Sequence, residues 1–228
     1  MSSGQGCSDS GSYGVENSPK PDSGKLARFR AEDCLLGVVE KARDLGHPVH
    51  LAVADAGWVT VDFDNECFVP EVALESDFFR APPEQVEVST GSEPNPNKAR
   101  PLSELLWKSA YYGSAGALLD GYHVYDVVEL ECWPNLTRIP HARSCLPLCS
   151  LLARRPSSIS FAHRMLRVPQ ADALRFYSAA RAAGYLRLVS AQPGRSETGQ
   201  GSPAKQTDET GSDSSRFWSR LFSRFSGL

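Results

Sequence analysis

The stretch from residue 133 to residue 189 limits the fold most strongly, because it combines frequent apolar residues with helix start and stop signals. Ser158 precedes an apolar run in the way that an N-cap precedes a helix. Pro169 suits the first turn of a further helix, and Gly184 supplies its end. These signals predict three helices and a closing strand, over residues 141–155, 159–166, 169–184 and 185–189.

The preceding part of the chain shows a different apolar period. Residues 48–54 read PVHLAVA, in which Val49, Leu51 and Val53 alternate with smaller or polar residues, as in a half-buried strand. The patterns there predict helices over 26–45 and 102–119, and strands over 48–54, 58–63, 66–69, 85–89 and 125–132. Residues 25–132 are therefore expected to form a small acidic α+β unit, in which an antiparallel meander is flanked by helices.

Both ends of the chain are rich in small and polar residues and contain few large apolar ones. Segments of this composition cannot bury enough apolar surface to offset the loss of chain entropy. Residues 1–24 are expected to be disordered, and residues 190–214 to form a disordered linker. No apolar run approaches membrane-spanning length, and the first residues show no secretory pattern. The six cysteines show no paired spacing, so a reduced, cytoplasmic protein is expected.

Charge divides the central part of the chain into two. Residues 25–132 hold nine Lys or Arg against nineteen Asp or Glu, whereas residues 133–189 hold nine Arg and a single acid, Asp172. A basic block of this kind attracts nucleic acid, an acidic protein surface or anionic lipid. The alternative is that the acidic part of the same chain neutralises it, and the near-cancellation of the two charges favours this alternative.

The order of elements over residues 141–189 resembles a helix-turn-helix module of the winged-helix type. Three helices, a tight turn between the last two and a strand after the terminal glycine carry the resemblance. The residues at its cap, core and helix-end positions are Ser158, Ile159, Leu166, Pro169, Ala173, Tyr177, Ala180, Gly184, Tyr185 and Leu186. The resemblance implies that a basic winged-helix-like module over residues 133–189 follows the acidic unit. In such modules the third helix enters the major groove of DNA.

The outer face of that third helix bears on DNA binding. With the helix ended at Gly184, its outward arc holds mostly Leu and Ala together with two arginines. Leu174, Arg175, Ser178 and Arg181 form the candidate interaction face. The arginines are able to bind guanine or phosphate, but the arc lacks Asn, Gln, Lys and Thr. Packing against a partner or against another part of the chain is therefore favoured over the reading of bases.

Candidate catalytic and metal-binding residues are few. His141, Cys145 and Cys149 are spaced by four, and His163 would complete a zinc ligand set in composition. No Cys-x-x-Cys pair supports such a site, and Pro147 is expected to delay the regular helix that would carry the ligands, so buried core cysteines are favoured. The histidines lie in no catalytic motif, and no phosphate-binding glycine loop is present. We therefore expect a non-enzymatic protein without a metal or a cofactor.

The last residues, 215–228, differ from the linker before them. As a helix they would place aromatic side chains and a leucine on one face, beside a row of arginines spaced by four. The residues of this predicted binding segment are Arg216, Phe217, Trp218, Arg220, Leu221, Phe222, Arg224 and Phe225. So short a peptide is not stably helical alone in water, so we expect it to fold on an anionic membrane surface or in an apolar groove of another protein. Docking onto the protein's own core is the remaining alternative.

Together these features favour a cytoplasmic adaptor or regulatory protein that acts through protein–protein contacts. Residues 215–228 would dock on a partner or on a membrane, which for a cytoplasmic protein means its inner face. The alternative is a DNA-binding transcriptional regulator that uses the basic helical module.

Overall fold

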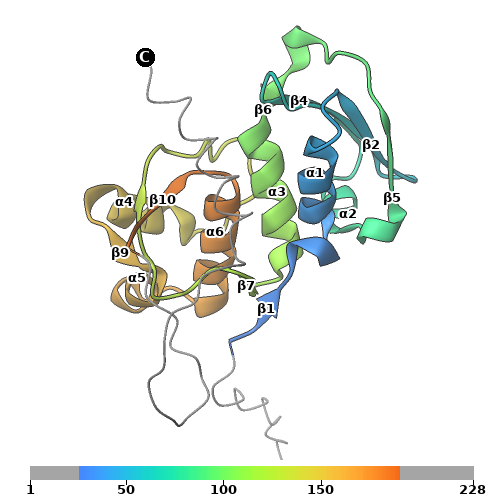
Figure 1. Ribbon diagram of the computed structural model, residues 1–228. Helices are drawn as coiled ribbons and strands as arrows, with labels where there is room; N and C mark the ends of the chain where they lie inside the picture. The colour runs from blue at the N-terminus through green and yellow to red at the C-terminus, as the bar shows by residue number, and fades with distance from the viewer. Residues whose placement is uncertain (1–25, 191–228) are drawn as a thin grey trace, which may run out of the picture. The chain divides into compact units, whose positions relative to one another are not determined.

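The computed structural model describes residues 26–190, and this part of the chain has the expected mixed α+β fold (Figure 1). The helices are α1 (Leu35–Arg43), α2 (Glu75–Arg80), α3 (Leu102–Ser114), α4 (Cys145–Arg154), α5 (Ile159–Leu166) and α6 (Gln170–Ala182). The strands are β1 (Arg28–Phe29), β2 (Val49–Val53), β3 (Gly57–Asp62), β4 (Cys67–Val72), β5 (Val86–Thr90), β6 (Arg100–Pro101), β7 (Leu118–Leu119), β8 (Val127–Leu130), β9 (Ser157–Ser158) and β10 (Leu186–Ser190). Short 3₁₀ helices are η1 (Ala31–Asp33), η2 (Pro83–Gln85) and η3 (Pro96–Lys98).

The predicted meander forms the centre of a five-stranded antiparallel sheet. β2, β3 and β4 pair in sequence, β5 joins the free side of β2, and β6 joins that of β4. The alternation expected for residues 48–54 is confirmed in β2, where Val49, Leu51 and Val53 are buried and the residues between them are half-buried. The buried side chains of the sheet belong to the same apolar cluster as those of α1 and α3.

The first helix is shorter than the predicted span of 26–45. Cys34 is extended (φ −145°, ψ 175°), so α1 begins only after it. The residues before Cys34 form β1, which pairs in parallel with β7, and then η1. Gly37 allows η1 to pack tightly on α1, because a Cβ atom at that position would lie 2.5 Å from the carbonyl oxygen of Ala31.

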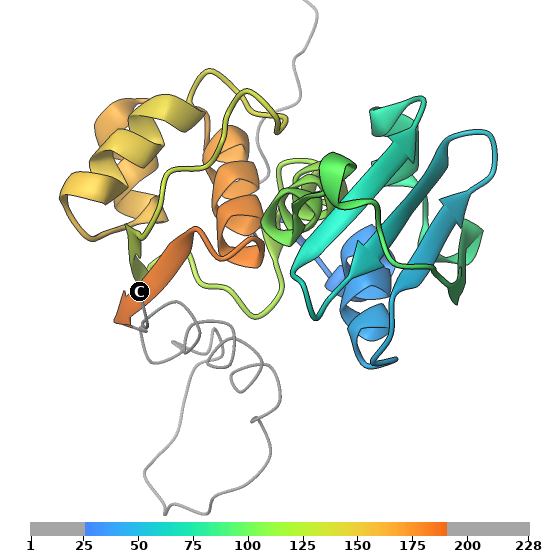
Figure 2. The same cartoon turned by 90° about the horizontal axis from the view of Figure 1, so that it is seen from above.

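α3 is the central helix of the described chain. It contacts α1 and α2 on the side of the sheet and α6 on the other side (Figure 2). It ends at Ser114 rather than at the predicted residue 119. Ala115 (φ 46°) and Gly116 (φ 89°) adopt left-handed conformations there, which turn the chain into β7.

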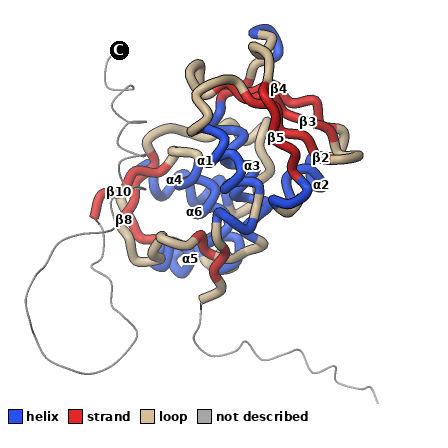
Figure 3. The backbone as a smooth tube through the Cα atoms, turned by 45° about the vertical axis from the view of Figure 1, so that its right-hand side comes forward, coloured by secondary structure: helices blue, strands red, loops and turns tan. Residues whose placement is uncertain are grey.

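Residues 127–190 form a helical layer with a small sheet of its own. β8 lies between β9 and β10 in a three-stranded antiparallel sheet (Figure 3). The strand predicted over 125–132 is therefore present, but it pairs with strands of the basic half. α4 begins at Cys145, later than the predicted residue 141 but before Pro147, the residue expected to delay it. Pro147 lies in the first turn of the helix, where a missing N–H costs no helical hydrogen bond.

The acidic and basic halves share one hydrophobic core. Its buried side chains run from Leu36 in α1 through Leu105 and Trp107 in α3 to Tyr177 in α6. The predicted boundary at residue 132 therefore falls inside a continuous core. Among the residues that the structure describes, no helix has the length and apolar character needed to cross a membrane.

Candidate interaction surface

The predicted interaction face of α6 is covered by other parts of the same chain. Leu174 and Ser178 are buried. The Ser178 hydroxyl accepts a hydrogen bond from the backbone N–H of Leu119 (3.0 Å) and donates to the carbonyl oxygen of Ala117 (3.4 Å). α6 also makes its most extensive contact with α3. Packing within the chain, one of the two arrangements favoured by the sequence, therefore covers Leu174 and Ser178.

The two arginines of that face lie over tyrosine rings inside the chain. The Arg175 guanidinium carbon lies 5.2 Å from the ring centre of Tyr111 on α3, and that of Arg181 lies 4.8 Å from the ring centre of Tyr122. Burial raises the pKa of Tyr122 to about 12, so its phenol stays neutral beside the guanidinium. These cation–π contacts engage both arginines of the predicted face and link α6 to the first half of the chain.

The acidic half engages few of the arginines of the basic block. Arg138 lies 3.9 Å from Glu104, and Arg187 pairs with both Glu129 and Glu131. Among the described residues, five further arginines are exposed and form no salt bridge, namely Arg143, Arg154, Arg155, Arg164 and Arg167. Charge neutralisation within residues 26–190 is therefore partial, and a basic surface remains.

Part of this basic surface lies beside exposed apolar side chains on α5. Phe161 and Met165 are 41% and 45% exposed, and they lie on one face of α5 with Arg164. The Arg155 guanidinium carbon lies 5.6 Å from the ring centre of Phe161, which joins the end of α4 to this face. We name Arg154, Arg155, Phe161, Arg164 and Met165 the α4–α5 face.

Local sequence signals position the α4–α5 face. The Ser158 side chain accepts a hydrogen bond from the backbone N–H of Phe161 (3.3 Å), and so caps α5 as predicted. Arg167 ends the helix in a left-handed conformation (φ 54°). The Arg164 guanidinium donates to the carbonyl oxygen (2.8 Å) and to the hydroxyl (3.0 Å) of Ser160, which directs it along the helix surface. The arrangement offers fixed positive charge beside apolar area.

Of the residues considered for zinc, only the two cysteines of α4 lie together within residues 26–190. Cys145 and Cys149 are buried in the core side of α4, whereas His141 is exposed and its Nδ1 lies 3.0 Å from the carbonyl oxygen of Ile139. A hydrogen bond with Cys149, and then burial, raise the pKa of the Cys145 thiol. Within residues 26–190 there is no group of three or more His, Cys, Asp or Glu that could hold a metal ion. Both thiols act as apolar filling of the helical layer.

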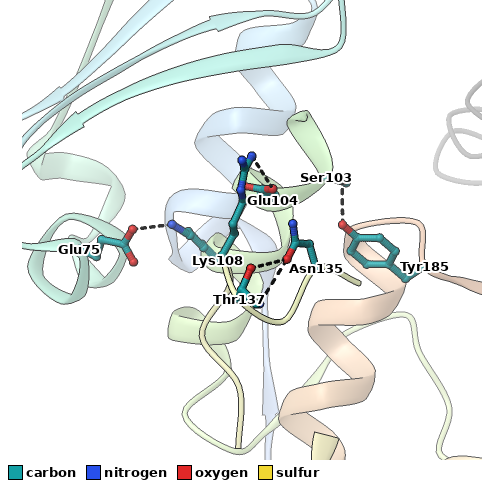
Figure 4. A network of polar contacts seen from close by, with 8 residues as sticks. Glu75, Ser103, Glu104, Lys108, Asn135, Thr137 and Tyr185 are labelled. Atoms are coloured by element: carbon teal, nitrogen blue, oxygen red, sulfur yellow. Dashed lines mark hydrogen bonds and ion pairs between the residues drawn. The ribbon is translucent and has the colours of Figure 1, made fainter. Parts of the chain in front are cut away.

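A buried polar network on α3 is absent from the sequence predictions (Figure 4). Lys108 extends from α3 to Glu75 on α2 (2.5 Å), and Glu104, one turn earlier, faces Arg138. The Ser103 hydroxyl lies 3.1 Å from that of Tyr185, which follows α6. The signal that could have found this network is a pair of charged residues spaced by four inside an apolar helix.

The acidic residues near the hairpin turns shape the turns. Asp62 is buried, and its Oδ1 accepts hydrogen bonds from the backbone N–H groups of Asp64 (3.1 Å) and Asn65 (3.0 Å). Its Oδ2 accepts a further bond from the Asn65 side chain (2.7 Å). This carboxylate holds the turn between β3 and β4 in the manner of an Asx turn.

The predicted binding segment 215–228 lies outside the described residues. No protein-family model matches this chain, and neither the curated proteins nor the solved structures include a match to it. Function must therefore be inferred from the side chains of the chain itself.

Proposed function

We propose that this chain is a non-enzymatic adaptor or regulatory protein that acts through protein–protein contacts. The observation that supports the proposal best is the α4–α5 face, where exposed apolar side chains stand among arginines that form no salt bridge within the described residues. Arginine and aromatic residues carry much of the binding energy at protein interfaces. The partner that this chemistry fits is an acidic protein segment that also carries apolar side chains.

The helical layer supports a winged-helix-like module as the scaffold of this face. α4, α5 and α6 follow one another with a tight turn before Pro169, and β10 comes directly after α6. The strand that pairs with β10 is β8, which precedes α4, whereas a wing is formed by strands after the third helix. We propose the module as a variant of the winged-helix arrangement on these grounds.

The C-terminal peptide, residues 215–228, would supply a second contact. Its predicted aromatic face and arginine row suit an anionic membrane surface or a groove on a partner. A cytoplasmic protein held at the inner face of the membrane would bring the partner of the α4–α5 face to that surface.

DNA binding remains the second candidate, and the exposed arginines favour it. Five guanidinium groups that form no salt bridge within the described residues would attract phosphate, and this binding would weaken as the salt concentration rises. In a winged-helix arrangement the base-reading helix would be α6, and α6 is buried against α3. DNA contacts of this chain would therefore be limited to the backbone and independent of sequence.

Charge reversal on the α4–α5 face tests the adaptor proposal. Arg155→Glu with Arg164→Glu should remove the proteins that the full chain captures from cells, while Lys41→Glu, an exposed cation on α1, should retain them. Phe161→Ala should reduce capture without changing net charge. Capture unaffected by all three variants would refute the proposal. Binding of the wild-type chain to random-sequence duplex, lost with the charge reversal and independent of Phe161, would establish the DNA alternative instead.

Deletion of residues 215–228 tests the second contact. The full chain should co-sediment with vesicles containing phosphatidylserine, and the deleted chain should not. Vesicles of phosphatidylcholine alone provide the control for charge. If neither chain binds either vesicle, the membrane form of the proposal fails and the peptide is left with a protein groove as its site.

A further inference from the structure

β5 is an open edge of the five-stranded sheet. Within the described residues, β2 is its only strand neighbour, and the four residues after Val86 are all exposed. The opposite edge, β6, has two residues and includes Pro101, which is a common protection against unwanted pairing. β5 has no Pro, no Lys and no bulge in its register with β2. It lies on the side of the sheet that faces away from the helical layer (Figure 1).

The register shows which backbone groups of β5 point away from β2. The N–H of Gly91 donates to the carbonyl oxygen of Pro48 (2.8 Å), so the pair of Gly91 and Pro48 is hydrogen-bonded. Hydrogen-bonded and non-bonded pairs alternate along an antiparallel ladder. Ser89 and Glu87 therefore bond to β2, while Val86, Val88 and Thr90 direct their backbone groups outward. The N–H of Val86 is already used, since it donates to Pro83.

These outward groups are accompanied by an exposed apolar side chain. Val88 is 45% exposed, although it faces the helix-covered side of the sheet with Leu51, its fully buried neighbour on β2. A strand added beside β5 would cover Val88 and pair the free backbone groups of Val88 and Thr90. Both features favour an extended segment as the occupant of this edge.

We propose that the occupant is β5 of a second copy of this chain, paired antiparallel about a two-fold axis at Val88. In this register Val88 lies opposite Val88, Glu87 opposite Ser89, and Val86 opposite Thr90. The two Val88 residues exchange N–H···O bonds, and each Thr90 N–H donates to the carbonyl oxygen of the other copy's Val86. The pair places no like charges directly opposite each other, and the Ser89 hydroxyl faces the Glu87 carboxylate. The result is one continuous sheet across both copies, with the isologous contact that two-fold symmetry requires.

Self-complementarity is the reason for choosing a second copy over an unrelated peptide. Any strand could satisfy the open backbone groups, but this register also matches the side chains of β5 to themselves. Strands of five residues bury less area than a standard interface, so association should depend on protein concentration. Such a dimer would carry two α4–α5 faces.

Cysteine cross-linking tests the register directly. In a background in which Cys7 and the exposed Cys132 are both replaced by Ser, Val88→Cys should form a disulfide-linked dimer when copper phenanthroline is added as the oxidant. Facing Cα atoms of a bonded pair lie about 5.5 Å apart, within disulfide range. Thr90→Cys in the same background should not cross-link. In this register Thr90 lies opposite Val86 of the other copy, so the two positions 90 are four residues apart along the strand, or roughly 14 Å. Equal cross-linking of both variants, or none at Val88→Cys, would overturn the proposal.

Substitutions at Val88 test the contact without cross-linking. The wild-type chain should sediment as a monomer–dimer equilibrium, and Val88→Lys should be monomeric because two ammonium groups would meet at the axis. Val88→Pro should act in the same way, since the N–H that it removes points away from β2. Far-UV circular dichroism would show that both variants stay folded. A wild-type chain that is monomeric over the whole accessible concentration range would overturn the proposal, and so would dimers retained by both variants.

Discussion

Lys108 is a buried cation, and its energetic role depends on one partner. Its side chain is 2% exposed and lies 2.5 Å from Glu75, whose own side chain is 46% exposed. It also lies 5.7 Å from the centre of the Phe79 ring. Removing one member of such a pair leaves a desolvated charge, whereas replacing both members by apolar groups costs much less. The pair therefore fixes α2 on α3 more than it adds to net stability.

We predict that Glu75→Ala alone lowers the free energy of unfolding by roughly 1–3 kcal/mol, a range reduced from that of fully buried pairs because Glu75 is half exposed. Adding Lys108→Met should recover part of this loss, since methionine fills a similar volume without a charge. Urea denaturation of the two variants and of the wild type measures the difference. A double variant that is less stable than Glu75→Ala alone would show that the unpaired charge of Lys108 does not control the cost.

The buried phenol of Tyr122 should make the free energy of unfolding depend on pH in the alkaline range. Burial raises its pKa from 10.0 to about 12 in the folded chain. The folded state therefore holds its proton more tightly than the unfolded state, and stability falls as pH rises from about 10 to about 12. The loss is at most about 2.7 kcal/mol, from two pKa units at 1.36 kcal/mol each. Denaturation curves at several pH values should show a smaller decline for Tyr122→Phe than for the wild type, and equal declines would contradict this origin.

At the scale of elements, a single hydroxyl makes the hydrogen bond between α6 and β7. Ser178 is the hydrogen-bond acceptor for the buried N–H of Leu119. Ser178→Ala should therefore cost roughly 1–3 kcal/mol, because that N–H would be left without a partner. Ser150→Ala on the half-buried side of α4 is the matched control and should change stability by less than about 0.5 kcal/mol. Thermal denaturation of the pair separates the two cases, and equal effects would show that the hydroxyl is dispensable.

The elements with clear periodicity were predictable from sequence, and those set by tertiary contacts were not. The meander, α5 and α6 follow from alternation, caps and glycine ends. α2 has only Phe78 and Phe79 as buried residues, which is too little for a period to show. The sequence left open whether the outer face of α6 packs on a partner or on its own chain, because a face of Leu, Ala and Arg suits either contact. Similarly, the positions of the arginines in the sequence do not show which of them form salt bridges with Asp or Glu.

At the scale of the whole described chain, the shared core makes the two halves interdependent. Trp107 on α3 is fully buried, its ring meets those of Phe176 and Tyr185 edge-on, and its indole N–H donates to the carbonyl oxygen of Pro140 (2.9 Å). Each of these partners comes from the basic half, so the acidic half alone would expose this side of α3. The division into acidic and basic segments is thus a division of charge and not of folding units.

A chain whose core crosses the charge boundary should unfold in one step. We predict that residues 26–190 lose the β2–β4 meander and the α4–α6 layer at the same urea concentration, because α3 packs on both parts within a single core. Amide signals from β3 and from α5, followed by nuclear magnetic resonance, report on the two parts separately, and far-UV circular dichroism gives the global midpoint. A fragment of residues 26–120 should be largely unfolded, since Trp107 would lose its partners and the N–H of Leu119 in β7 would lose its acceptor, the Ser178 hydroxyl. Two separate midpoints, or a folded fragment, would mean that the sheet unit is stable without the helical layer, and that the contact of α3 with α6 is an interface between domains able to part.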